Sequence, residues 1–269
     1  MFELLWNTVF FNFLDERAVV YSNRDPGAAM KNNNKFLRVV LVCITSFVVT
    51  AVAYSPSLAE TIAMIGTGNV AGALGPEFAA QGHEIIYGSR DPGRAEVIEL
   101  VARTGGDASA TGQVEAAEQA DIVVIAVPGG VAEEVVIGLG DLSGKIIIDP
   151  TNRVAPGDDG FMSHSTDTSN GELIQAIVPD AHVVKAFNTL NYRTMIDPES
   201  SGGPVTIPIV GNNDEAKATV AALVEGMGLE VIDLGPIRFS HVLEGMLVIW
   251  VNGNRIGSPF NYYLRPVPE

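Results

Sequence analysis

A six-residue stretch, GTGNVA at positions 66–71, has the spacing needed to hold a phosphate chain. It follows the apolar run TIAMI and opens a helical pattern, which gives the order strand, turn, helix. Gly66 permits the tight turn, Gly68 lets the backbone approach a pyrophosphate, and Ala71 lets the helix pack against the strand. The stretch therefore predicts a dinucleotide site. The residues expected to bind are Gly66, Thr67, Gly68, Asn69 and Val70.

The second strand pattern, HEIIY, decides which dinucleotide is expected. It ends in GSR at positions 88–90, with no acid at its tip. An NAD site places Asp or Glu there to hold the ribose 2′-hydroxyl. Ser89 can instead donate to a 2′-phosphate, Arg90 can pair with it through two hydrogen bonds, and Arg94 adds charge one turn later. The pattern favours NADP over NAD, although Asp91 argues against it. The alternative is a solvated loop without a ligand.

Two other strand ends carry candidate binding residues. DIVVIAVP ends in Val127-Pro128, and ligands bind at the carboxyl ends of strands in open α/β sheets. We expect this end to border the ribose and nicotinamide. VVKAF runs into Asn188-Thr189, whose side chains can orient the nicotinamide amide or the second substrate. The alternative for these two residues is a helix N-cap or a turn.

Composition argues against several other chemistries. One cysteine, Cys43, excludes a disulfide within the chain or a thiolate metal site, and the four histidines lack ligand spacing. No Ser-His-Asp context, nucleophile elbow or inward lysine stands out, so we predict no metal site and no catalytic side chain. Hydride transfer between stacked rings needs positioning more than acid–base help. The formal net charge of −16 argues against binding nucleic acid or anionic membranes.

The elements that must position these residues alternate between strand and helix patterns. Apolar runs rich in Val and Ile occur at 61–65, 84–87, 122–127, 145–148, 183–187, 205–210 and 229–234. Helix patterns occur at 69–81, 94–103, 113–119, 131–139, 172–177, 214–227 and 239–251. The alternation predicts one α/β domain over 60–269. Its expected fold is a Rossmann-type, doubly wound, mostly parallel sheet with C-terminal helices.

Two features interrupt this pattern. Pro76 lies inside the first helix pattern, where it should remove a hydrogen bond and kink the helix. The segment 151–170 is long, polar and rich in Gly, Pro and Ser, so we expect a functional or mobile loop there.

The N-terminal residues carry the pattern of an export signal. Residues 39–54 are uncharged and follow three basic residues, and the small residues of SLA at 57–59 suit a cleavage site after Ala59. We expect residues 30–59 to be a Sec-type signal peptide, residues 1–29 to be a non-native or disordered extension, and the protein to be exported. The alternatives are a membrane anchor through residues 39–59, a buried helix, or a cytoplasmic protein.

Several segments together resemble the NADPH-dependent oxidoreductases of coenzyme F-420, an 8-hydroxy-5-deazaflavin. They include IAMIGTGNVAGALG, GHEIIYGSRDPGRAE, GGDASATG, KAFNTLN and FSHVLEGML. The resemblance implies that the positions of Thr67, Ser89, Arg90 and Arg94 bind NADP, and that hydride passes directly between nicotinamide and deazaflavin. It also implies a homodimer with C-terminal helices in the interface.

The second substrate stays open. KAFNT is also similar to the reductase domain of ferric reductases. We therefore keep two alternatives to a deazaflavin reductase. One is a flavin or ferric reductase, and the other is a non-catalytic NADP-binding sensor.

Overall fold

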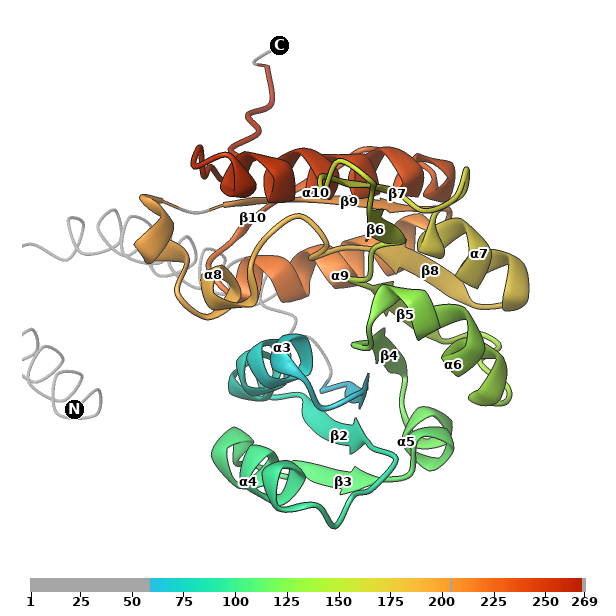
Figure 1. Cartoon of the computed structure of the whole chain (residues 1–269). Helices are drawn as coiled ribbons and strands as arrows, with labels where there is room; N and C mark the ends of the chain where they lie inside the picture. Colours follow the sequence, from blue (N-terminus) through green and yellow to red (C-terminus); the bar gives the residue numbers. More distant parts are fainter. Residues whose placement is uncertain (1–58, 204, 268–269) are drawn as a thin grey trace, which may run out of the picture. The chain divides into compact units, whose positions relative to one another are not determined.

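A computed structural model describes residues 59–203 and 205–267, which alternate between strands and helices (Figure 1). Its strands are β1 Thr61–Ile65, β2 Glu84–Gly88, β3 Ser109–Thr111, β4 Ile122–Ile125, β5 Ile146–Asp149, β6 Val154–Pro156, β7 Met162–His164, β8 His182–Lys185, β9 Thr206–Gly211 and β10 Glu230–Asp233. Its α-helices are α3 Asn69–Ala80, α4 Ala95–Thr104, α5 Gln113–Gln119, α6 Ala132–Gly138, α7 Asn170–Ile177, α8 Tyr192–Ile196, α9 Asp214–Gly226 and α10 Ser240–Arg255.

The main sheet confirms the predicted Rossmann-like α/β architecture. Its order is β10-β9-β8-β5-β4-β1-β2-β3, and the pairs from β3 to β8 are all parallel. β9 pairs with β8 in the antiparallel direction, and β10 runs parallel to β9. β1 lies between β2 and β4, so the chain reverses its winding there. This switch point is where open α/β sheets form their ligand crevice.

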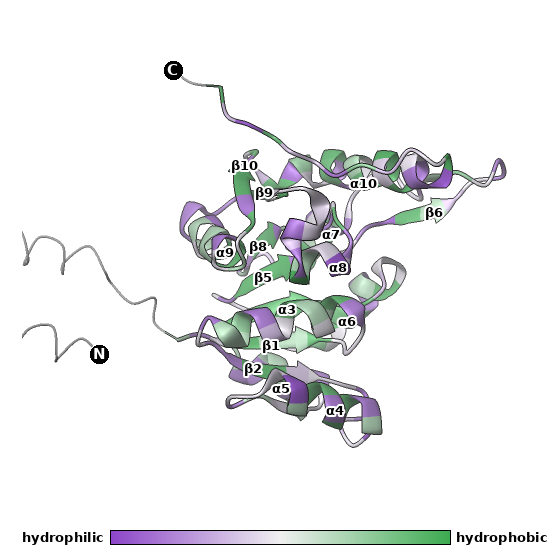
Figure 2. Cartoon of the chain, turned by 90° about the vertical axis from the view of Figure 1, so that its left-hand side faces the viewer, coloured by the Kyte–Doolittle hydropathy of each residue, from purple (hydrophilic) through white to green (hydrophobic). Residues whose placement is uncertain are grey.

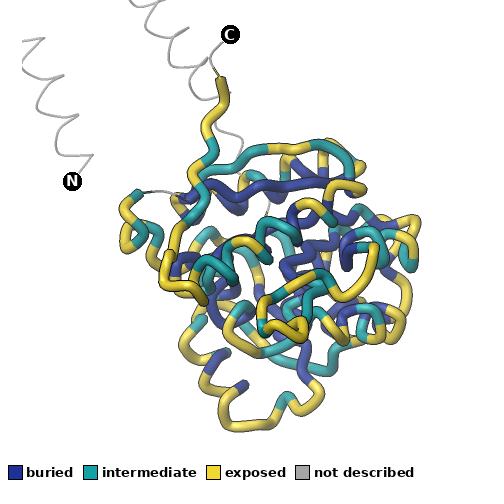
Figure 3. The backbone as a smooth tube through the Cα atoms, turned by 45° about the horizontal axis from the view of Figure 1, so that its top comes forward, coloured by how far each residue is buried: buried dark blue, intermediate teal, exposed yellow. Residues whose placement is uncertain are grey.

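Helices cover both faces of the sheet and enclose two apolar layers. One layer packs α3, α4, α8 and α9 against the strands, with Leu74, Phe78 and Val220 fully buried. The other packs α5, α6, α7 and α10, with Leu139 and Ile174 buried. Hydrophobic residues follow the strands (Figure 2), and buried backbone runs through the middle of the molecule (Figure 3). The strands are apolar along their whole length because both of their faces are covered.

Short-range signals mark several helix ends where the sequence predicts. Gly82, Gly140 and Gly228 have φ values of +95°, +85° and +74° just after helix ends, a conformation that glycine adopts without strain. α7 begins with a capping box, in which the Ser169 side chain accepts from the Glu172 amide and the Glu172 carboxylate accepts from the Ser169 amide.

Three expectations differ from the structure. The predicted 151–170 loop contains the antiparallel hairpin β6–β7, and its last residue already belongs to α7. β4 ends at Ile125, two residues before the predicted end at Val127. β3 and α8 are absent from the predicted elements, since each is only a few residues long. The predicted final helix at 239–251 is α10, which follows the 3-10 turn η3 Ile237–Phe239 and ends at Arg255.

Pro76 lies inside a continuous helix, because α3 runs from Asn69 to Ala80 through it. Leu74 before the proline and Phe78 after it are both fully buried. Packing of both halves of the helix against the sheet therefore outweighs the local cost of the proline.

The predicted extension and most of the predicted signal peptide, residues 1–58, lie outside the described residues. In the part of the chain that the structure describes, no helix is both long enough and apolar enough to span a bilayer.

Candidate functional site

A cavity of about 970 Å³ opens at the carboxyl ends of β1, β2 and β4. Eight of the predicted site residues line it. They are Gly66, Thr67, Gly68, Ser89, Arg90, Arg94, Val127 and Pro128. The predicted residues thus come from three separate strand ends, and the switch point of the sheet brings them together.

The two motif glycines have different structural roles in this cavity. Gly66 has φ +113°, its amide donates to the Gly88 carbonyl at 2.9 Å, and a Cβ there would lie 2.3 Å from the Ala126 carbonyl oxygen. Gly68 is the N-cap of α3 in extended conformation, and a Cβ there would meet no atom within 4 Å. No side chain caps α3, so its first amides are free to bind an anion. The cradle fits a pyrophosphate.

A cationic rim follows β2. Ser89 is 7% exposed, and its hydroxyl oxygen accepts from the Asp91 amide at 3.2 Å. Arg94 Nη2 donates to Thr67 Oγ1 at 3.2 Å, and its Nε lies 3.2 Å from a Glu96 carboxylate oxygen. Arg90 is exposed and makes no side-chain hydrogen bond with any described residue. The arginines of the rim are therefore placed to receive an anionic group.

An apolar wall lines another part of the same cavity. α5 contributes Val114, and α6 and the residue after it contribute Val135 and Leu139. The polar residues Gln113 and Glu134 of the same two helices also line the cavity. Such a wall suits the flat, weakly polar face of an adenine ring.

The remaining predicted site residues lie elsewhere. Asn69 lines an adjoining cavity of about 390 Å³ between α3, α4 and α8. Val70 packs against the core layer beneath α3 and lines neither cavity.

Asn188 and Thr189 are each 2% exposed and line neither of these two cavities. The Asn188 Nδ2 donates to Asn152 Oδ1 and to the Leu243 carbonyl, both at 3.0 Å. Neither residue is a helix N-cap, because α8 is capped by Asn191. Thr189 Oγ1 and Asn188 Oδ1 have no hydrogen-bond partner among the described residues.

The backbone just before Asn188 is strained. Phe187 has φ +63°, and in the described segments it is the one residue other than glycine with a positive φ. A bulky residue rarely adopts this conformation unless its surroundings impose it, and such strain concentrates at functional sites. Phe187 lies two positions after the end of β8 and directly before Asn188.

A buried ion cluster near this strand end is absent from the sequence-based predictions. Lys185, Asp149 and Glu244 are all 0% exposed, and Lys185 Nζ lies 2.7 Å from Asp149 Oδ2 and 2.8 Å from Glu244 Oε1. Burial alone would lower the pKa of Lys185, but the two carboxylates outweigh it and raise that pKa. The sequence signal was a lysine in the apolar strand VVKAF and a glutamate in the apolar helix segment HVLEGML.

The comparisons with known proteins agree with this geometry. Residues 61–153 match the family model described as NADP oxidoreductase, coenzyme F420-dependent. A crystal structure of a candidate F420-dependent NADP reductase from Arthrobacter sp. FB24 is 30% identical. It covers 77% of this chain and 100% of its own, with a TM-score of 0.70. The chain belongs to this family.

Members of the F420-dependent family among the curated proteins include the F420-dependent NADP reductase of Methanothermobacter marburgensis. It is 27% identical over 70% of this chain and 89% of its own length. The metalloreductase STEAP3 of Rattus norvegicus is also 27% identical, over 71% of this chain, and the match spans only 37% of STEAP3. These relatives are reductases, so the chain is an NADP-dependent oxidoreductase by family.

More distant solved structures support the fold alone. A reductive aminase from Aspergillus terreus, solved in complex with NADPH, is 16% identical with a TM-score of 0.55.

Proposed function

We propose that this chain binds NADPH across the switch point and passes its hydride to a deazaflavin of the F-420 type or a flavin-like acceptor. The pyrophosphate would lie on the N-terminus of α3 over Gly68, and the 2′-phosphate between Ser89, Arg90 and Arg94. The adenine would lie against the apolar wall of α5 and α6. This order directs the nicotinamide past Val127 and Pro128, toward the ends of β5 and β8.

The chemistry proposed needs positioning rather than a protein acid or base. NADPH supplies the hydride when bound, and an acceptor ring stacked on the nicotinamide takes it directly. The chain's residues bind the phosphates, orient the ribose at Val127 and Pro128, and exclude water through the apolar wall. Asn188 and Thr189 are buried at the end of β8 and line neither cavity, so their predicted contact with the nicotinamide amide is not part of this proposal.

One observation carries the cofactor assignment: the glycine loop and the cationic rim of Ser89, Arg90 and Arg94 line the same cavity. Arg90→Ala tests it. A charge-assisted contact to the 2′-phosphate is worth about 1.5–3 kcal/mol, so NADPH binding should weaken by that amount while NADH binding stays unchanged.

Both affinities are measured by fluorescence titration of the purified protein. Arg193→Ala is the control, because Arg193 is an exposed arginine on α8 that lines neither cavity. Equal losses for NADPH and NADH in Arg90→Ala would contradict the assignment.

The acceptor is tested by profiling NADPH oxidation with a deazaflavin, FMN and a ferric chelate. Similarity to the Methanothermobacter reductases supports the deazaflavin, and similarity to STEAP3 supports a ferric or flavin acceptor as second candidate. Turnover with the deazaflavin alone supports the first, and preference for FMN or ferric chelate supports the second. Tight NADPH binding without turnover on any acceptor would favour a non-catalytic sensor.

We further propose that the chain is exported and cleaved after Ala59. The pattern of basic residues, apolar run and SLA supports this, and β1 begins two residues after the cleavage point. N-terminal sequencing of the protein from its natural source tests it. Glu60 as the first residue is expected, and cytoplasmic protein that retains residues 31–59 would contradict it.

A homodimer through α10 is also proposed. Val242, Ile249 and Ile256 are 60%, 62% and 65% exposed and recur every seven residues along α10 and its C-cap. Large apolar side chains left in one row on a helix are typical of an interface.

A further inference from the structure

The charged groups of Lys185, Asp149 and Glu244 lose their hydration in the folded chain, which costs free energy. Each of the three side chains is 0% exposed, and desolvating such charges costs about as much as their attraction returns. Apolar side chains of similar volume would serve packing equally well. One cation faces two carboxylates, so the cluster also needs hydrogen bonds from elsewhere to balance its second negative charge.

Those hydrogen bonds come from one short segment, residues 151–153, and from the start of α7. Asp149 Oδ1 accepts from the Thr151 amide at 2.9 Å and from the Thr151 hydroxyl at 2.6 Å, and Lys185 Nζ donates to the Thr151 carbonyl at 2.8 Å. Glu244 Oε2 accepts from the Arg153 amide at 2.8 Å. The cluster thus holds the backbone of this segment on both sides of Asn152.

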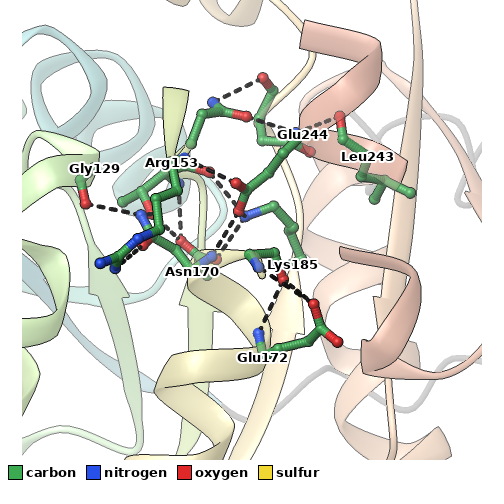
Figure 4. A network of polar contacts seen from close by, with 12 residues as sticks. Gly129, Arg153, Asn170, Glu172, Lys185, Leu243 and Glu244 are labelled. Carbon is green, nitrogen blue, oxygen red and sulfur yellow. Dashed lines mark hydrogen bonds and ion pairs between the residues drawn. The ribbon is translucent and has the colours of Figure 1, made fainter. Parts of the chain in front are cut away.

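The same cluster also orients α7. Glu244 Oε1 accepts from the Asn170 amide at 2.9 Å, at the positive end of that helix. Asn170 Nδ2 then donates to the Gly129 carbonyl at 2.9 Å and to the Thr151 hydroxyl at 2.7 Å (Figure 4).

Gly129 is where this network reaches the cofactor cavity. A Cβ at Gly129 would lie 1.9 Å from the Asn152 carbonyl oxygen, so the two backbones are in direct contact. Gly129 begins the 3-10 turn η1 Gly129–Val131. Pro128, directly before this turn, and Val131, at its end, both line the cavity. Residues 151–153, which the ion cluster holds, therefore pack against this rim and set its position.

We propose that Lys185, Asp149 and Glu244 are positioning residues that fix the Pro128–Val131 rim, and with it the nicotinamide half of bound NADP(H), through residues 151–153 and Asn170. The inference rests on the proposed function, since it takes the nicotinamide to lie at this rim. The 2′-phosphate and adenine bind at the opposite end of the cavity, which the cluster does not touch.

Binding of two ligands separates this role from a merely structural one. NADPH carries the nicotinamide, whereas 2′-phospho-ADP-ribose has the same phosphates and adenine without it. In Glu244→Gln and Lys185→Met, NADPH should bind about tenfold more weakly, as expected for loss of one or two buried hydrogen bonds, and 2′-phospho-ADP-ribose should bind as in wild type. The kcat of NADPH oxidation should fall as well. Glu244→Gln keeps the side-chain shape and an acceptor oxygen, so it provides the test if Lys185→Met does not fold.

A matched control exists on the other side of the sheet. Lys217 is 7% exposed and pairs with Asp233 at 2.6 Å and Asp214 at 3.0 Å, but these residues belong to α9 and β10 and do not line the cavity. Lys217→Met should leave the affinity ratio of the two ligands unchanged.

The binding results distinguish failure of the positioning role from failure of the proposed function. If wild type binds both ligands and the cluster variants weaken both equally or neither, the positioning role is wrong and the proposed cofactor site stands. If wild type binds neither ligand, the proposed function fails and this inference falls with it.

Discussion

At the scale of single residues, the two glycines of the GTGNVA motif show that one motif serves both folding and binding. Gly66 needs a positive φ and has no room for a Cβ beside the Ala126 carbonyl. Gly68 has an ordinary extended backbone and open space around its α-carbon. The fold itself therefore requires Gly66, whereas Gly68 is expected to serve the proposed pyrophosphate contact.

We expect the two alanine substitutions to separate these roles. Gly66→Ala should lower the free energy of unfolding by about 2 kcal/mol or more, because it adds a clash to a strained backbone. Gly68→Ala should leave that free energy unchanged and weaken NADPH binding by about 1.5–3 kcal/mol, since the methyl group blocks amide contacts to the pyrophosphate. Urea denaturation and NADPH titration measure the two effects. A loss of stability in Gly68→Ala would contradict this division.

At the scale of elements, the hairpin β6–β7 and helix α10 are joined by a histidine stack. The rings of His164 on β7 and His241 on α10 lie 4.0 Å apart at an interplanar angle of 23°. Their buried Nδ1 atoms find no hydrogen-bond partner in the described ranges. Next to them, the Asn252 side chain bonds both the amide and the carbonyl of Met162 at 2.8 Å. His164 can gain a proton at this contact between the hairpin β6–β7 and α10.

Lowering the pH should weaken the contact between the hairpin β6–β7 and α10 and reduce the stability of the fold. Burial, and secondarily the neighbouring His241, lowers the pKa of His164 below 6.5, while Glu244 opposes the shift. The unfolded chain then binds the proton more readily, so stability should fall as the pH drops from about 7.5 through 6.5. Burial also lowers the pKa of His83, which adds to the same trend.

Urea midpoints of wild type and His164→Phe at several pH values test this. Phenylalanine keeps the ring stack but cannot be protonated, so the variant should lose less stability between pH 7.5 and 5.5 than wild type. The remaining loss is expected from His83. The same pH dependence in both proteins would show that His164 does not contribute.

At the scale of the whole molecule, α10 has two faces with different tasks. Leu243 and Glu244 are buried against the sheet, while Val242 and Ile249 are exposed on the other side. Glu244 of the buried ion cluster thus lies on the inner face of the same helix. A dimer formed through the outer face of α10 would have its interface close to this cluster, which lies behind the rim of the cofactor cavity.

Ile249→Glu should therefore convert a dimer to a monomer without unfolding the chain. A charge in the centre of an apolar interface loses its hydration on association, whereas on a free surface it is tolerated. Light scattering with size-exclusion chromatography measures the mass, and circular dichroism checks the fold. Ile98→Glu, at a position 58% exposed on α4, is the control and should leave the mass unchanged. A monomeric wild type would contradict the proposed dimer.

The parts predicted from sequence are those with short-range signals. The Gly66–Gly68 spacing, the apolar strand runs and the glycines after helix ends each act within a few residues, and the structure has them where they were expected. The proline at position 76 does not end α3, because packing on both sides of it outweighs its local cost. The hairpin β6–β7 was missed because its strands are three residues long and lack an apolar run.

The sequence by itself determined the α/β alternation, the switch-point glycine loop and the arginines after β2, because each depends on residue type and spacing along the chain. Only the tertiary structure decided that Lys185 faces Glu244, 59 positions away, and that Asn188 binds Asn152 rather than capping a helix. The position of a charged residue inside an apolar run does not indicate which residue it pairs with. Its partner is chosen by which elements the sheet order places side by side, and that order is set by the burial of the whole core.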